Sequence, residues 1–143
     1  MHAGKLARLL RLFGFDTYYQ NDITTPDLVK KAVEENRILL SRNPSFSKNN
    51  LLHFVWIESE DPMQQMTQLN RHFSLQEKFQ PLSRCLVCNG LLQKVAKEVI
   101  VSQLKENTRL FYDEFWQCVS CHRVYWKGPH YERMKKVIAS FDT

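Results

Sequence analysis

The sequence predicts an α/β fold in two parts. Residues 1–80 suit a layer of helices on a mostly parallel sheet, and residues 81–143 suit a smaller β unit with a closing helix. The first prediction rests on helix-like and strand-like segments that alternate, which is typical of a parallel sheet covered by helices. The second rests on short strand-like segments around two Cys-x-x-Cys pairs, which is typical of hairpins held together by their cysteines.

The first element is a predicted helix over residues 4–14. Four apolar side chains recur at helical spacing and form one face, namely Leu6, Leu9, Leu10 and Phe13. Gly14 is a natural C-terminal stop. Three cations lie off this face, namely Lys5, Arg8 and Arg11. They form either the solvated side of the helix or a set of contacts for phosphates. Residues 16–19 then suit a short strand.

A second helix is predicted from its capping pattern. Thr25 supplies a hydroxyl cap, Pro26 suits the first helical position, and Asp27 places an acid in the first turn. The helix is expected to end at Asn36. The following residues, 37–41, form a short apolar run that suits a buried strand.

A strand and a third helix complete the first part. Residues 51–57 are apolar, β-branched or aromatic and suit a strand. Asp61 with Gln64 three residues later resembles a capping box, and Pro62 suits the first helical position. The helix is expected to bury one set of side chains, namely Met63, Met66, Leu69 and Phe73.

Acidic side chains gather where ligands bind to sheets of this kind. Ligands lie at the carboxyl ends of parallel strands, which here correspond to residues 20–24, 41–43 and 58–61. The candidate carboxylates are Asp22, Asp27, Glu60 and Asp61. Carboxylates that share a divalent ion can activate water for phosphodiester cleavage. The alternative is local, because Asp27 can complement a helix dipole and Asp61 can be an N-cap.

The two cysteine pairs predict a structural zinc site. The ligands would be Cys85, Cys88, Cys118 and Cys121, the only cysteines in the sequence. Each Cys-x-x-Cys knuckle places two thiolates on one turn, and two knuckles complete a closed tetrahedral shell with no open position. Disulfides and a redox-active pair are the alternatives. The sequence lacks the apolar run of a signal peptide, and a redox motif would normally occur once.

The segments around the cysteines suit a zinc ribbon. Residues 91–108 are mixed and partly strand-like, residues 123–126 suit a strand, and residues 129–141 suit an amphipathic helix. Residues 125–131 mix aromatic and basic character, from Tyr125 to Tyr131, and the candidate nucleic-acid contacts among them are Trp126, Lys127 and His130. Such a mixture can stack on and neutralise single-stranded nucleic acid. The alternative for Trp126 is a place in the small ribbon core.

Composition sets broad limits on function. The chain has a formal net charge of +5 and a pI of about 9.1, which is compatible with a nucleic-acid partner. No apolar stretch approaches the length of a membrane span. Without a signal peptide or a membrane span, the cytoplasm is the expected location.

Three stretches resemble the Mut-seven C-terminal ribonuclease family, and together they cover nearly the whole chain. They are GKLARLLRLFGFD at 4–16, RILLSR at 37–42, and the cysteine-containing stretch at 83–134 with SRCxxCNGxL, DEFWxCxxC and VYWxGxHxxRM. The resemblance implies a PIN-like, three-layer nuclease domain followed by a zinc ribbon. It also implies RNA as the substrate and Mg²⁺ or Mn²⁺ as the catalytic ion.

The resemblance assigns roles to individual residues. In a catalytic protein, the divalent ion would be held by Asp22, Asp27 and Asp61. Phosphates would be contacted by Lys5, Arg8, Arg11 and Arg42.

The chain departs from the family pattern at two places. Family members carry a short strand ending in an acid ahead of the glycine-lysine-leucine motif, whereas three residues precede Gly4 here. Where the family has threonine, arginine and aspartate, this chain has Ser41, Arg42 and Asn43. The neutral amide of Asn43 binds Mg²⁺ more weakly than a carboxylate does. We expect either a truncated start or a degenerate member that binds RNA without cutting it. A missing strand would leave a sheet edge for a second copy or a partner chain to cover.

Overall fold

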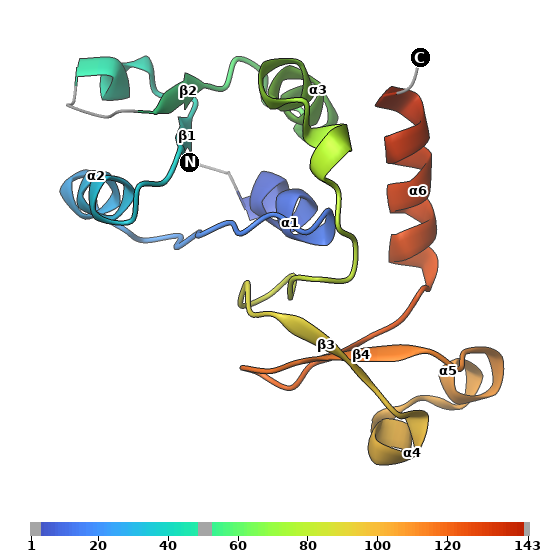
Figure 1. Ribbon diagram of the computed structural model, residues 1–143. Helices are drawn as coiled ribbons and strands as arrows, with labels where there is room; N and C mark the ends of the chain where they lie inside the picture. Colours follow the sequence, from blue (N-terminus) through green and yellow to red (C-terminus); the bar gives the residue numbers. More distant parts are fainter. Residues whose placement is uncertain (1–3, 49–52, 142–143) are drawn as a thin grey trace. The chain divides into compact units, whose positions relative to one another are not determined.

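The computed structural model describes residues 4–48 and 53–141, and the chain forms two compact units (Figure 1). The first, called here the α/β unit, contains residues up to Leu6 together with Tyr19–Phe73. The second, called here the ribbon unit, contains Ala7–Tyr18 and the residues from Ser74 onward. The domain boundary expected at residue 80 stays a prediction.

The α/β unit is built around one pair of parallel strands. Strand β1 (Leu39–Ser41) pairs with β2 (Phe54–Trp56), with Leu40 opposite Val55. The helices of this unit are α2 (Thr25–Glu34) and α3 (Pro62–Phe73), and a 3₁₀ turn, η1 (Pro44–Lys48), follows β1. A core cluster of Ala32, Leu39 and Phe46 is covered by Leu28, Val29 and Phe54. The two expected strands are confirmed within the described residues, and the sheet has one parallel pair there.

Both helices of the α/β unit begin at side-chain caps. The hydroxyl of Thr24 accepts a hydrogen bond from the Asp27 N–H at 3.3 Å, so the cap lies one residue before the predicted Thr25. The Asp61 carboxylate accepts from the Gln64 N–H at 3.1 Å, as predicted. Asn36 ends α2 with φ +52°, a left-handed conformation that asparagine tolerates better than most residues.

The strand predicted over residues 16–19 is wrong, because these residues have irregular backbone. The backbone of Thr17 forms hydrogen bonds with two side chains. The Thr17 N–H donates to Asn89 Oδ1 at 2.9 Å, and the Thr17 carbonyl accepts from Arg11 Nε at 2.9 Å. Because the N–H and the carbonyl of Thr17 are both satisfied by side chains, Thr17 does not require a strand partner.

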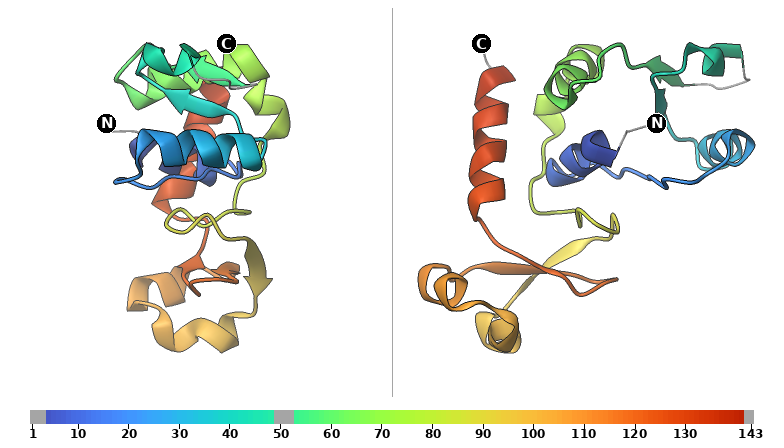
Figure 2. Two further views of the ribbon diagram at one scale, coloured as in Figure 1. Left: turned by 90° about the vertical axis from the view of Figure 1, so that its left-hand side faces the viewer. Right: turned by 180° about the vertical axis from the view of Figure 1, so that it is seen from behind.

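The ribbon unit contains a three-stranded antiparallel sheet. Its strands are β3 (Leu92–Val95), β4 (Phe115–Cys118) and β5 (Val124–Tyr125), with β4 in the centre. The chain between β3 and β4 forms α4 (Lys97–Ile100), η3 (Val101–Gln103) and α5 (Glu106–Phe111). Figures 1 and 2 show these short helices at one end of the strands. Helix α6 (Pro129–Phe141) has the predicted bounds.

Two aromatic groups build the core of the ribbon unit. Phe13, from the end of α1 (Gly4–Leu12), stacks on Phe79 with ring centroids 4.6 Å apart. Near the sheet, the buried Phe115 lies 6.1 Å from the Trp126 ring, which also contacts Tyr112. One further 3₁₀ turn, η2 (Leu75–Lys78), precedes the ribbon. Among the described residues, no helix is long and apolar enough to cross a membrane.

Candidate metal centre and predicted acidic site

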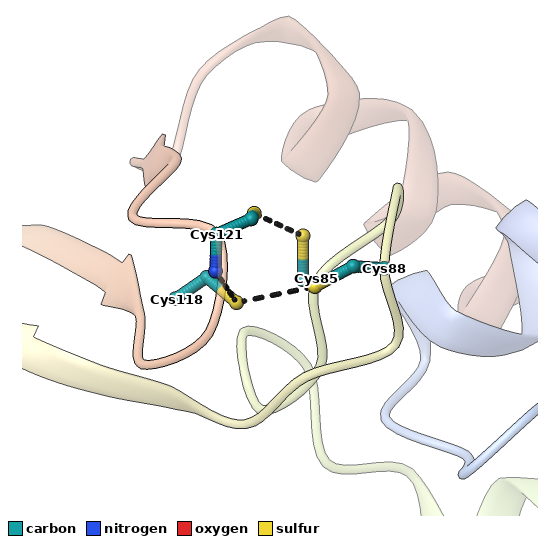
Figure 3. A group of neighbouring side chains, drawn as sticks. All are labelled: Cys85, Cys88, Cys118 and Cys121. Carbon is teal, nitrogen blue, oxygen red and sulfur yellow. Dashed lines mark hydrogen bonds between the residues drawn. The ribbon is translucent and has the colours of Figure 1, made fainter.

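Four sulfur atoms converge in the ribbon unit. Figure 3 shows Cys85 and Cys88 on one loop facing Cys118 and Cys121 on another. The sulfurs of Cys85 and Cys121 lie 3.6 Å apart, those of Cys88 and Cys118 lie 3.4 Å apart, and all four fall within 4.8 Å of one another. The predicted cysteine ligand set is therefore assembled.

The two knuckles have the same backbone construction. Asn89 N–H donates to the Cys85 carbonyl at 3.0 Å, and His122 N–H donates to the Cys118 carbonyl at 3.0 Å. Asn89 and His122 both have φ +67°, which turns the chain back after each pair. Beside the first knuckle, a Cβ on Gly90 would lie 2.8 Å from the Cys118 sulfur. Only glycine fits so close to the sulfur cluster.

The pKa values of Cys88, Cys118 and Cys121 are shifted in different directions. Burial opposes ionisation of Cys121, but hydrogen bonds from the backbone and side chain of Arg123 lower its pKa to about 6. For Cys118, burial is likewise outweighed by the N–H groups of Cys121 and Ser120, and its pKa is lowered. Desolvation and the neighbouring thiols raise the pKa of Cys88 to about 12, although its side chain reaches the surface.

Tyr125 supports the cluster from strand β5. Its hydroxyl lies 3.0 Å from the Cys85 sulfur and accepts a hydrogen bond from the Leu86 N–H at 3.1 Å. Burial and the contact with Cys85 raise the pKa of this phenol. The neutral hydroxyl therefore stays available to donate to a Cys85 thiolate, as groups around a metal ligand commonly do.

This donor set fits a structural metal ion. A tetrahedral zinc ion with zinc–sulfur bonds of about 2.3 Å places its sulfurs about 3.8 Å apart. The observed separations of 3.4 Å and 3.6 Å are close to that value. Four thiolates leave no open position for a substrate, so the site can hold a structural ion. Bound ion would displace the protons that the thiols still carry.

Arg11 lies under the first knuckle. Only 7% of this residue is exposed, and its guanidinium donates to the carbonyls of Thr17, Leu86 and Val87 at 2.9, 3.0 and 3.2 Å. Burial lowers the pKa of Arg11, while the facing Cys85 and Cys88 oppose that shift. This placement gives Arg11 a structural role, and the phosphate contact expected from the sequence stays a prediction. Its position under the knuckle depends on tertiary contacts that helical periodicity cannot show.

The three predicted catalytic acids have local roles in the α/β unit. Asp27 lies in the first turn of α2, Asp61 caps α3, and Asp22 accepts from the Gln20 amide at 3.1 Å. All three are exposed. Among the described residues, the acids form no group whose oxygens meet within 4.8 Å, in contrast to the cysteines. The predicted carboxylate set is therefore not assembled in this structure.

The carboxyl ends of the two parallel strands nevertheless lie side by side. Arg42, after β1, donates to the Glu60 carboxylate at 3.2 Å, and its carbonyl accepts from the Trp56 indole at 3.0 Å. Asn43 accepts from the Ser45 N–H at 3.0 Å and so closes a local turn. The loops that carry Arg42 and Glu60 meet as the parallel register predicts.

The remaining predicted nucleic-acid contacts are distributed over both units. Lys5, Arg8, Lys127 and His130 are exposed. Trp126 is half-buried and packs on Phe115 and Tyr112, in agreement with the alternative core role. Two rings lie by Lys127, those of Trp116 and Tyr131. The sequence places Tyr131 in the same aromatic and basic stretch as Lys127, but Trp116 was not anticipated. Tyr131 and Lys135 are four residues apart on α6, and that spacing was a usable signal.

The chain is thus a two-unit protein with a small antiparallel ribbon, an α/β unit and a four-cysteine cluster whose geometry fits a structural metal ion. Comparison with protein families makes this specific. The family model described as the Mut7-C RNAse domain matches residues 1–138, nearly the whole chain. The chain belongs to that family, which is of the ribonuclease type. No curated protein and no solved structure matches the chain.

Proposed function

We propose that this protein binds RNA, with a structural zinc ion holding the ribbon unit in shape. The family match over residues 1–138 supports RNA as the partner. The basic charge of the chain, +5, suits a polyanion. The four converging thiolates support zinc, because all-sulfur tetrahedral sites are typical of structural zinc.

The disposition of the acids favours binding over cleavage. Asp27 and Asp61 lie at helix N-termini, where each carboxylate already has a favourable local interaction. Asn43, at the position where the family pattern has aspartate, closes a turn with Ser45. A divalent ion would have to draw these separated groups together, which would cost the helices their first-turn interactions.

Cleavage by a PIN-like acidic site is the second candidate function. It is favoured by the description of the family and by the meeting of Arg42 with Glu60 at the carboxyl ends of β1 and β2. In this version Asp22, Asp27 and Asp61 would hold Mg²⁺ or Mn²⁺, which would supply a nucleophilic water. Arg42 would neutralise the phosphate.

Cytoplasmic location and a second chain on an open sheet edge stay predictions from the sequence.

One experiment separates the two functions. The zinc-loaded chain is incubated with labelled single-stranded RNA, with and without Mn²⁺, and both binding and cleavage are followed. Salt-sensitive binding without cleavage supports the proposal. Manganese-dependent cleavage that Asp27→Asn with Asp61→Asn abolishes would favour the second candidate. Asp61→Asn keeps the acceptor that caps α3, and Asp27→Asn leaves the Thr24 cap of α2 in place, so a loss of activity would not reflect a loss of fold. Absence of both binding and cleavage would refute both.

A further inference from the structure

Lysines and aromatic rings alternate across one side of the ribbon sheet and onto α6. The Lys127 Nζ lies over two rings, 5.9 Å from the centroid of Trp116 and 5.5 Å from that of Tyr131. The Lys135 Nζ also lies near this tyrosine, 5.9 Å from the centroid of the Tyr131 ring. Lys94 is the cross-strand partner of Trp116 on β3, so the two side chains share a face of the sheet.

The resulting set is called here the lysine–aromatic row: Lys94, Trp116, Lys127, Tyr131 and Lys135. All five residues belong to the ribbon unit. They come from β3, β4, the turn after β5, and α6. The row therefore depends on the ribbon fold for its alternation, since its members are far apart in sequence.

At the centre of the row, the charge of Lys127 is available to bind a ligand. Lys94 lies 3.6 Å from the Glu114 carboxylate and Lys135 lies 3.8 Å from that of Glu132. In the described part of the chain, Lys127 forms no such ion pair, and its recorded contacts are with the two rings. An exposed ammonium with only aromatic neighbours is suited to an incoming phosphate.

We propose that the lysine–aromatic row binds single-stranded RNA, with unpaired bases stacked on Trp116 and Tyr131 and the backbone phosphates on Lys127. The inference rests on the proposed RNA binding and gives it a location. Single strands fit because their bases can leave the stack and lie on aromatic rings, whereas a duplex keeps its bases paired. Trp126 is excluded from this role, because its ring packs on Phe115 and Tyr112.

The first test removes a ring. The full zinc-loaded chain is titrated into fluorescein-labelled oligouridine, and Kd is measured by anisotropy. Tyr131→Ala should weaken binding about fivefold or more, because stacking contributes about 1–3 kcal/mol per base. Tyr131→Phe should bind as the native chain does, since it keeps the ring. The matched control is Phe111→Ala, which removes an aromatic ring that is 76% exposed and lies on α5.

The second test removes the central charge. Lys127→Ala should weaken binding and reduce the slope of log K against log salt by about 0.7, as expected for one lost phosphate contact on a single strand. Lys136→Ala is the control, because it removes an exposed lysine from the same end of the chain without touching either ring. Because Lys127 is exposed, we expect Lys127→Ala to keep its fold and its metal. Its result therefore tests the proposal even if Tyr131→Ala loses its metal.

The outcomes are distinguishable. If the native chain binds oligouridine but Lys127→Ala and Tyr131→Ala match their controls, the row is not the binding surface, although RNA binding stands. If the native chain does not bind, the proposed function fails and the inference fails with it. If both variants weaken binding of polyglutamate as much as of RNA, the row is a general anion surface, and base stacking is refuted.

Discussion

The candidate metal-binding side chains converge in the ribbon unit but stay apart in the α/β unit. In the ribbon unit, four thiols from two loops meet within 4.8 Å. In the α/β unit, Asp27 lies in the first turn of α2, and Asp61 caps α3. The difference lies in how local the geometry is. A Cys-x-x-Cys knuckle fixes two ligands on one turn, so only two pieces must meet. A carboxylate site needs several separate loops, and each acid has a competing partner nearby.

The largest expected effect is on the ribbon. Cys118→Ser should abolish metal binding and the cooperative unfolding of the ribbon unit, because Cys118 is fully buried and structural zinc contributes about 10–16 kcal/mol in zinc-finger peptides. Metal content per chain and thermal unfolding provide the measurement. Ser120→Ala changes the same loop without removing a ligand and should retain both properties. Full metal content in Cys118→Ser would show that the cluster is not the ligand set.

The next effect concerns the support under the first knuckle. Arg11→Met should lower the free energy of unfolding by about 3 kcal/mol, because three carbonyls lose their donor in a buried place. Urea unfolding of the metal-loaded chain measures this. Arg8→Met, which removes an exposed cation from the same helix, should change stability by no more than about 0.5 kcal/mol. Equal effects for the two variants would contradict the structural role of Arg11.

In the α/β unit the corresponding change is smaller. Asp61→Ala should cost about 1 kcal/mol through loss of the α3 cap, whereas Asp61→Asn should be close to neutral because the amide oxygen still accepts from Gln64. Chemical unfolding of the two variants in parallel gives the comparison. If Asp61→Asn destabilises as much as Asp61→Ala, the negative charge matters more than the cap, and the local interpretation of this acid is wrong.

The smallest effect depends on pH. Hydrogen bonds from Lys31 and Arg37 lower the pKa of Glu35 at the end of α2. Because the folded pKa lies below the unfolded value of about 4.3, the stabilisation is complete above that pH and is lost as the pH falls through the folded pKa. Glu35→Gln should therefore unfold at slightly lower urea than the native chain at pH 7. The two midpoints should converge once the pH falls below the folded pKa of Glu35, and a constant gap would refute the assignment.

The elements that the sequence predicted well are those with local signals. Helix α6 has an apolar stripe and a proline at its first position, and the cysteine spacing alone identifies the knuckles. Of two adjacent threonines, only Thr24 has the extended backbone of a cap, and no pattern distinguishes it from Thr25. Helices α4 and α5 were missed because both are short and neither has a side-chain cap.

The features that the sequence did not reveal have a different cause, since they depend on contacts between distant residues. Asn89 lies 72 positions after Thr17, yet its side chain takes the hydrogen bond that a strand partner would have taken. Arg11 is off the apolar face of its helix, yet residues 86 and 87 cover it. The aromatic partners of Lys127 likewise come from β4 and α6. Helical and strand periodicity describe one element at a time, so they could not reveal the contacts made by Asn89, Arg11 and Trp116.

The discontinuity of the ribbon unit has a consequence for biosynthesis. Residues 7–18 leave the ribosome before residues 19–73 of the α/β unit, but their partners in the ribbon unit follow only after Phe73. During that interval, the Arg11 guanidinium has no carbonyls from residues 86 and 87 to meet. The ribbon unit can therefore be completed only after residues 19–73 and the first knuckle have been made.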